Sequence, residues 1–377
     1  MVRWEAWGLE AAGAAMIAVA TFGVIRTLLL PGSRLTPVQR LIENATDLGF
    51  RAVARMGIDG DRRHRVRSIH APLILIIQLW SWLAAYLAGF GLVLWAVNHS
   101  VSQGFREAGS SLLTMGFAVT HGGPGTAIDL VAGATGLIVV ALQIAYLPTL
   151  YTAYNRRESE VSLLAIRAGE PSWGPELIAR AYLMGSLGEL PALWASWERW
   201  AADVAESHSS YPVLIRFRTA DPLSSWLTGF LAVLDSAALW AAIKGPEAPL
   251  QARLFLRMGF GCLQQVAKTV RIPFNPDPRP DDPIVLTEEE FGEGLARLRS
   301  YGMEIERPVD KIWVDFKGWR VNYEGIAYQL AREIDAPPAL WSGPRRIPTP
   351  SIPPRRLLDR TPEDPEGLTG GLRGGGA

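Results

Sequence analysis

The sequence contains few side chains whose types and spacing could support catalysis. One of its 377 residues is cysteine, which excludes an intrachain disulfide, and its five histidines are too scattered to predict a metal site. His208, Ser209 and Ser210 could suggest a nucleophile, but no second histidine or placed acid supports one, and a Ser-rich helix-capping turn is the preferred interpretation. Phosphate-loop, dinucleotide-binding and zinc-protease motifs are absent. The sequence therefore predicts a protein that is not an enzyme and holds no cofactor.

A different chemistry is suggested by residues 105–126, FREAGSSLLTMGFAVTHGGPGT. This stretch is mostly uncharged, is rich in hydroxyl side chains and glycine, and lies between two long apolar runs. Three interpretations are open. It could be a membrane-crossing helix, a surface loop, or a segment that enters the membrane and returns to the same side. The apolar stretches on either side of residues 105–126, and the charges next to them, distinguish these three interpretations.

Three apolar stretches are long enough to cross a bilayer, which takes roughly 20 residues of helix. Residues 71–97 and 130–154 carry no charged side chain. Residues 11–30 form the third stretch, with Arg26 close enough to its end to reach the head groups. A signal peptide cleaved after Ala20 is the alternative for this stretch, but its apolar run continues past that point. We expect three membrane helices, in agreement with a mean hydropathy of +0.12 and 49% hydrophobic residues.

The distribution of arginine predicts the topology. The loop between the first two spans is short and Arg-rich, so the positive-inside rule places it in the cytoplasm and the N-terminus outside. Arg156 and Arg157 follow the third span. They lie on the cytoplasmic side only if residues 105–126 do not cross the membrane, which favours a re-entrant segment. Overall the 37 basic and 37 acidic residues balance, and nothing in this charge predicts a nucleic-acid partner.

A re-entrant segment needs a short helix followed by a turn, because irregular backbone at membrane depth must be shielded from lipid. Here a helix from about Arg106 would be followed by a turn at residues 114–118. A span, a short helix, the pattern Thr-x-Gly-aromatic-small and a second span together resemble the pore module of the potassium-channel superfamily, as in bacterial two-helix and two-pore-domain-like channels. The resemblance implies an ion-selectivity filter whose hydroxyl and carbonyl groups replace the hydration shell of K⁺ or another monovalent cation. Its residues would be Thr114, Met115, Gly116, Phe117 and Ala118.

The filter-like run departs from the family pattern at two places. Ala118 stands where the family has a second glycine, and its methyl group would be strained at positive φ. Val119 replaces the usual aspartate, and His121 is a nearby titratable group. A potassium-selective pore and a non-selective cation pore both remain open.

The resemblance also places a gating bend in the third span, at Gly133, Gly136 and Pro148. The alternative is that the glycines allow close helix packing and that the proline only kinks the helix. One pore loop per chain cannot surround an ion, so the interpretation implies a homo-oligomer, with a cyclic tetramer expected.

The C-terminal half has the pattern of a helical domain. Pro175 suits a first helical position, and Thr287 with Glu290 form a capping box. Residues 222–243 are apolar enough to span, with Asp235 their only charge. We prefer a buried core helix there, because a charge at the centre of a lipid-facing helix is costly. The proline- and glycine-rich residues 343–377 are expected to be disordered.

Together these patterns predict an all-α integral membrane protein with three transmembrane helices, a re-entrant pore loop and an α-helical cytoplasmic domain. It would lie in the cell membrane as a multi-pass protein, with its N-terminus outside. The expected function is passive cation conduction; the alternatives are a membrane-anchored sensor or interaction protein and, less favoured, a membrane enzyme. The expected domains are an N-terminal helix at 1–30, a cytoplasmic loop at 31–70, a pore module at 71–155 (outer helix 71–97, pore loop 103–122, inner helix 127–154), a cytoplasmic domain at 156–342 and a tail at 343–377.

Overall fold

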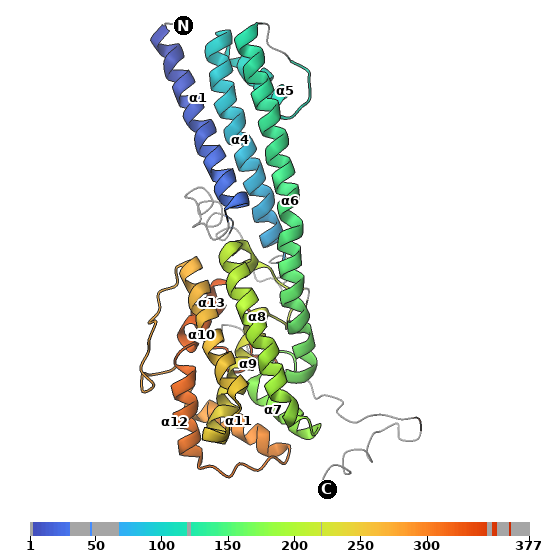
Figure 1. Ribbon diagram of the computed structural model, residues 1–377, viewed down its shortest axis with the longest axis vertical. Coiled ribbons are helices and arrows are strands. Elements are labelled where there is room, and N and C mark those ends of the chain that lie inside the picture. The colour runs from blue at the N-terminus through green and yellow to red at the C-terminus, as the bar shows by residue number, and fades with distance from the viewer. Residues whose placement is uncertain are drawn as a thin grey trace. The chain divides into compact units, whose positions relative to one another are not determined.

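The computed structural model describes residues 3–30, 46, 68–118, 122–219, 221–344, 349–352 and 362. Within these ranges the regular elements are all helical, as predicted. The chain divides into two compact units, residues 1–153 and 154–377 (Figure 1). The Arg-rich loop predicted at 31–70 and most of the tail predicted at 343–377 lie outside the described residues.

Four described helices are long and apolar enough to cross a membrane. Three of them begin in the first unit and overlap the stretches that were predicted to span: α1 (Arg3–Val24, continued by the π-helical turn η1, Ile25–Leu29), α4 (His70–Asn98) and α6 (Gly123–Ala168). The third helix is longer than predicted, because no residue between Tyr154 and Ala168 interrupts it and the helix carries on into the second unit. It contains Pro148 without a break.

In the first unit, α1 packs closely against α4. A Cβ atom built at Gly13 would lie 2.6 Å from the carbonyl oxygen of Gly89, so the two backbones approach where neither residue has a side chain. Further along the same face, the Tyr86 hydroxyl donates a hydrogen bond to Oγ1 of Thr21 at 2.9 Å. The helix predicted within residues 11–30 therefore packs against α4 along its length.

The second unit is a helical bundle around one central helix, α9 (Trp226–Lys244). Every residue from Trp226 to Ile243 is buried, and α7, α10 and α12 pack against it. The ring of Phe230 lies 5.0 Å from that of Trp200 and 6.4 Å from that of Trp197, centroid to centroid. The remaining helices are α7 (Gly174–Leu183), α8 (Leu190–Ser210), α10 (Leu250–Val270), α11 (Glu288–Ser300), α12 (Val309–Arg320) and α13 (Glu324–Glu333), with short 3₁₀ turns at Leu187–Glu189, Pro212–Arg216 and Gly245–Glu247.

The burial of α9 by protein explains how a helix of span-like composition can belong to a helical bundle. Its one charged side chain inside the apolar run, Asp235, is 1% exposed and forms an ion pair with the fully buried Arg320. Tyr323 donates to the same carboxylate oxygen at 2.7 Å. The structure thus agrees with the prediction of a buried core helix.

Arg320 uses its whole guanidinium group inside the core. Nε donates to Glu324 at 2.9 Å, and Nη2 donates to the Tyr328 hydroxyl at 2.8 Å and the Trp341 carbonyl at 2.6 Å. Buried charges are tolerated when they are paired and hydrogen-bonded in this way. Beside this network, the predicted capping box is confirmed: Oγ1 of Thr287 accepts from the Glu290 amide at 3.2 Å.

We predict that Arg320→Leu lowers the free energy of unfolding by about 3–5 kcal/mol, because it leaves Asp235 buried without its counter-charge. The matched control is Arg279→Leu, which removes an exposed pair with Asp281 and should cost less than about 1 kcal/mol. Denaturant unfolding of the full chain in detergent, followed by tryptophan fluorescence, measures both. Equal losses for the two variants would contradict the prediction.

Candidate pore module

The candidate site begins where α4 ends and the chain reverses direction. His99 has a left-handed backbone conformation, with φ at 58°, and closes α4. Ser100 follows as the N-cap of α5 (Val101–Leu112), and its hydroxyl accepts from the Gln103 amide at 3.4 Å. The short helix predicted from about Arg106 is therefore present, and it starts five residues earlier along the chain than its predicted first residue.

The short helix α5 runs back along α4. A Cβ atom at Gly104 would lie 2.5 Å from the backbone nitrogen of Trp95, whereas one at Gly109 would lie 3.6 Å from a methyl carbon of Leu87. Later residues of α5 therefore contact residues of α4 that lie farther from the C-terminal end of α4. Glycine at residue 104 allows this approach, because a side chain there would meet the α4 backbone.

The C-terminal end of α5 rests on α6. A Cβ atom at Gly136 would lie only 1.9 Å from the carbonyl oxygen of Leu112, and one at Gly133 would lie 3.3 Å from that of Ser111. The Ser111 hydroxyl donates to the Asp129 carboxylate at 2.9 Å. Figure 1 shows α5 beside α4, and the two glycine contacts place the end of α5 against α6.

Residues 113–118 form a turn that is held by the backbone and the side chain of one buried residue, Ser110. Ser110 is 1% exposed; its carbonyl oxygen accepts from the Met115 amide at 2.8 Å, and its hydroxyl oxygen accepts from the Ala118 amide at 2.9 Å. Serine at residue 110 was not among the predicted site residues, since a helical serine has many possible partners and the sequence does not identify the one used.

The backbone of the filter-like run differs from the expectation in one respect. Thr114 and Gly116 have positive φ angles, 55° and 67°, but Ala118 is not among the described residues with positive φ. The methyl group of Ala118 is therefore unstrained in this conformation, and a β-branched residue, Thr114, carries the strain instead. Met115 and Phe117 are 66% and 58% exposed within the single chain.

The hydroxyl of Thr114 donates to the carbonyl oxygen of its neighbour Leu113 at 2.8 Å. This hydrogen bond uses the hydroxyl proton and leaves the lone pairs of Oγ1 for another partner, which is the arrangement a cation ligand needs. Val119 and His121 lie outside the described residues.

A buried acidic residue of α5, Glu107, is a further feature that the sequence prediction missed. Glu107 is 2% exposed and accepts hydrogen bonds from the Asn98 amide group and, at 2.9 Å, from Nε2 of Gln103. An acidic residue beside Arg106, in a mostly uncharged stretch between two apolar runs, was the available signal, because charged side chains are costly in a membrane unless they are paired.

Of the three predicted hinge residues, Gly136 has a clear packing contact in this structure, with Leu112. Gly133 makes a looser contact of the same kind, and Pro148 lies within the unbroken helix α6. The structure brings the two glycines to the end of α5 and leaves Pro148 farther along the helix. Their part in gating stays a prediction.

The alternative nucleophile in the second unit has no supporting geometry. His208 is fully buried, and Nη1 of Arg157 donates to its Nε2 at 2.8 Å. Burial, together with this guanidinium, holds the pKa of His208 well below its usual value, so the imidazole is neutral and accepts the hydrogen bond. The Ser209 hydroxyl donates to the Ala205 carbonyl at 2.6 Å, and the Ser210 hydroxyl donates to the Glu206 carboxylate at 3.0 Å. The hydroxyl beside Nδ1 of His208, at 3.1 Å, is that of Ser207, and it donates to the Asp203 carbonyl.

We predict that Gly136→Ala destabilises the protein by about 1–3 kcal/mol, because its methyl group must push the Leu112 carbonyl away. Gly133→Ala is the matched control and should cost less, since its methyl group needs only a small adjustment of Ser111. Thermal unfolding of both variants in detergent provides the comparison. A Gly136→Ala protein as stable as Gly133→Ala would show that the close contact is absent.

The chain matches no protein-family model, and comparison with curated proteins and with solved structures finds no significant similarity.

Proposed function

We propose that this chain is one subunit of a passive cation pore in which residues 113–118 line the ion pathway. The observation that carries the proposal is the place where α5 ends. The last turn of α5 lies beside Leu87 of α4 and Gly136 of α6. At about 1.5 Å per residue, Leu87 lies roughly 17 Å from the end of α4, and Gly136 lies roughly 20 Å from the start of α6. A bilayer core is about 30 Å thick. These distances support a turn near mid-depth, hence three spans with a re-entrant segment between the second and third.

The exposure of the turn supports an oligomer. Thr114, Met115 and Gly116 are exposed in the single chain, although lipid cannot satisfy the irregular backbone of such a turn. Other copies of the chain, or a water-filled path between copies, can do so. We therefore propose a homo-oligomer with the turns at its axis, and a cyclic tetramer as the most economical closed form.

The electrostatics of α5 favour a cation at this place. A helix presents its carbonyl groups and the negative end of its dipole at the C-terminus, and α5 ends directly before the turn. The hydroxyl oxygen of Thr114 and the carbonyl groups of residues 114–118 would supply uncharged ligands. Potassium is the first candidate for the permeant ion. Because Ala118 takes the place of a glycine in the filter-like run, a pore that does not select among monovalent cations is the alternative to test.

The remaining parts of the proposal follow the charge distribution. The protein would lie in the cell membrane as a multi-pass protein, with its N-terminus outside and residues from about 156 in the cytoplasm. The helical cytoplasmic domain would bias opening or hold the oligomer together. The alternative is a membrane-anchored sensor or interaction protein, for which the turn would not conduct.

The direct test is ion flux from liposomes that contain the purified protein, with K⁺ and Na⁺ compared. We expect flux in the unmodified chain and a loss of more than about tenfold in Gly116→Val, because a β-branched residue is strained at a φ of 67° and distorts the turn. Gly292→Val, in α11 and with open space around it, is the control that should leave flux unchanged.

Each outcome of this experiment separates the two functions. Flux that depends on Gly116 supports the pore. An absence of flux from folded oligomers, or equal flux from the Gly116 and Gly292 variants, would favour the sensor or interaction protein.

A further inference from the structure

The second unit contains a groove that no part of the proposed pore uses. It has a volume of about 650 Å³ and is bordered by residues 160–167 of α6, the end of α7 and the first half of α8. Its floor is apolar and buried, with Leu177, Leu193 and Trp197 each less than 10% exposed. Leu163, Ile166 and Met184 stand at its edge and are 54%, 59% and 44% exposed. An apolar hollow with exposed apolar edges is typical of a binding surface.

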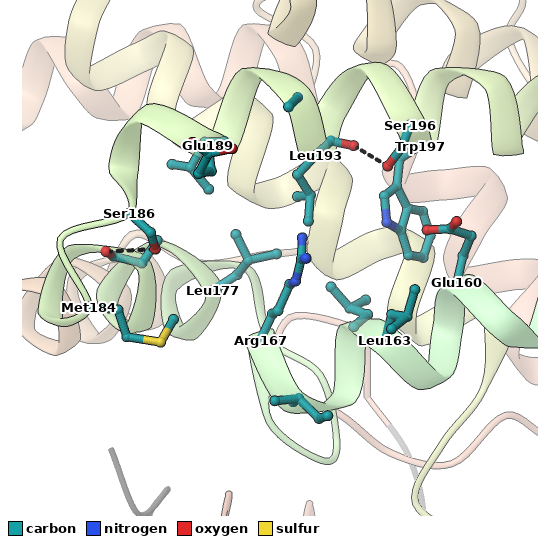
Figure 2. Close-up of a pocket in the computed structure, with 15 residues that line it drawn as sticks. Glu160, Leu163, Arg167, Leu177, Met184, Ser186, Glu189, Leu193, Ser196 and Trp197 are labelled. Atoms are coloured by element: carbon teal, nitrogen blue, oxygen red, sulfur yellow. Dashed lines mark hydrogen bonds between the residues drawn. The ribbon is translucent and has the colours of Figure 1, made fainter. Parts of the chain in front are cut away.

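Three charged side chains of the groove are left without a partner. Arg167 points into the groove between Leu177 and Leu193, and Glu160 and Glu189 lie toward its opposite ends (Figure 2). Within the part of the chain that the structure describes, none of the three forms a hydrogen bond or ion pair. A matching occupant therefore needs apolar side chains, basic groups for the two glutamates and an acidic group for Arg167.

A segment of this composition follows Ile352 in the sequence. Ile352 packs against the core of the second unit, and its Cγ2 atom lies 2.5 Å from the position of a Cβ atom at Gly169. Gly169 comes two residues after Arg167. The sequence that follows Ile352 is PPRRLLDR, residues 353–360, with Arg355 and Arg356 before a pair of leucines and Asp359 after it.

The distance to be bridged is within reach. An extended chain covers roughly 20 Å in six residues. The groove borders α6 from Arg167 back to Glu160, which is roughly 11 Å at about 1.5 Å per residue, and Gly169 lies two residues after Arg167. Leu357 and Leu358 can therefore reach the apolar floor from the position of Ile352.

We propose that residues 353–360 dock into this groove of their own chain. Leu357 and Leu358 cover the apolar floor, the arginines pair with Glu160 and Glu189, and Asp359 pairs with Arg167. The C-terminal segment is then an internal ligand of the last turns of α6. This inference is independent of the proposed pore, because it rests on the second unit alone.

Disulfide trapping in the full chain tests the docking. We pair Leu357→Cys with Ala192→Cys, an exposed lining residue of α8, and in the control with Ala296→Cys, an exposed residue of α11 outside the groove. The native Cys262 does not interfere, since it is fully buried and burial raises the pKa of its thiol. Because the docked segment has a high local concentration, we expect the 192–357 pair to close within one chain more than about ten times faster than the 296–357 pair.

The charges provide a second readout. Arg355→Glu combined with Arg356→Glu should slow the 192–357 crosslink several-fold, and the addition of Glu160→Lys and Glu189→Lys should restore it. Equal closing rates for the two cysteine pairs would overturn the proposal. So would a crosslink that joins two chains, because a second copy would then be the occupant, or a crosslink rate that does not respond to the charge changes.

Discussion

The contact between the Leu112 carbonyl and Gly136 determines how α5 fits between its neighbours. A backbone carbonyl and a helix can approach this closely only where the helix has no side chain, and this fixes the level at which α5 ends. The turn at residues 113–118 must then begin at that level, so its position along α6 depends on a single glycine. Ser110 adds the second constraint, because its carbonyl and hydroxyl groups hold both the middle and the end of the turn. Together they define the site without any charged side chain in the turn itself.

In the second unit, a helix of span-like composition is enclosed by protein. The apolar surface of α9 is covered by protein on all sides, and Asp235 is neutralised by Arg320 rather than placed at the surface. Arg157 illustrates the same principle near the end of the third span. It is fully buried, and it donates to the carbonyl groups of Leu214 and Phe217 at 2.7 and 2.8 Å. Packing thus explains why an arginine is present at residue 157. The predicted topology therefore depends more on Arg156, whose side chain is 60% exposed.

Hydropathy and capping patterns were sufficient to predict most helices. Residues 71–97 correspond to His70–Asn98, and the Thr287–Glu290 pattern marks the start of α11. These signals are local, since a helix and its cap are built from residues a few positions apart. The extension of α6 to Ala168 was missed, because charged residues after Tyr154 end a membrane span without ending a helix.

The features that the sequence could not predict involve residues that meet only in the folded chain. The pairing of Asp235 with Arg320, the burial of Glu107 and the two roles of Ser110 depend on which side chains come together, and neither composition nor periodicity contains that information. The backbone at Ala118 is a similar case. A filter-like pattern suggested strain at that residue, whereas the described turn places the positive φ angles at Thr114 and Gly116.

The most direct test of the re-entrant pore module is the course of residues 101–122 relative to the bilayer. Single cysteines at residues 102, 115 and 122, in proteoliposomes, can be tested with a membrane-impermeant thiol reagent and with lipid-borne quenchers placed at different depths. If residues 105–118 enter the membrane and return, Ser102→Cys and Gly122→Cys react from the same side, while a fluorophore on Met115→Cys lies deepest. Labelling of residues 102 and 122 from opposite sides would indicate a crossing helix. A shallow position for residue 115 would indicate a surface loop, and either result would contradict the re-entrant pore module.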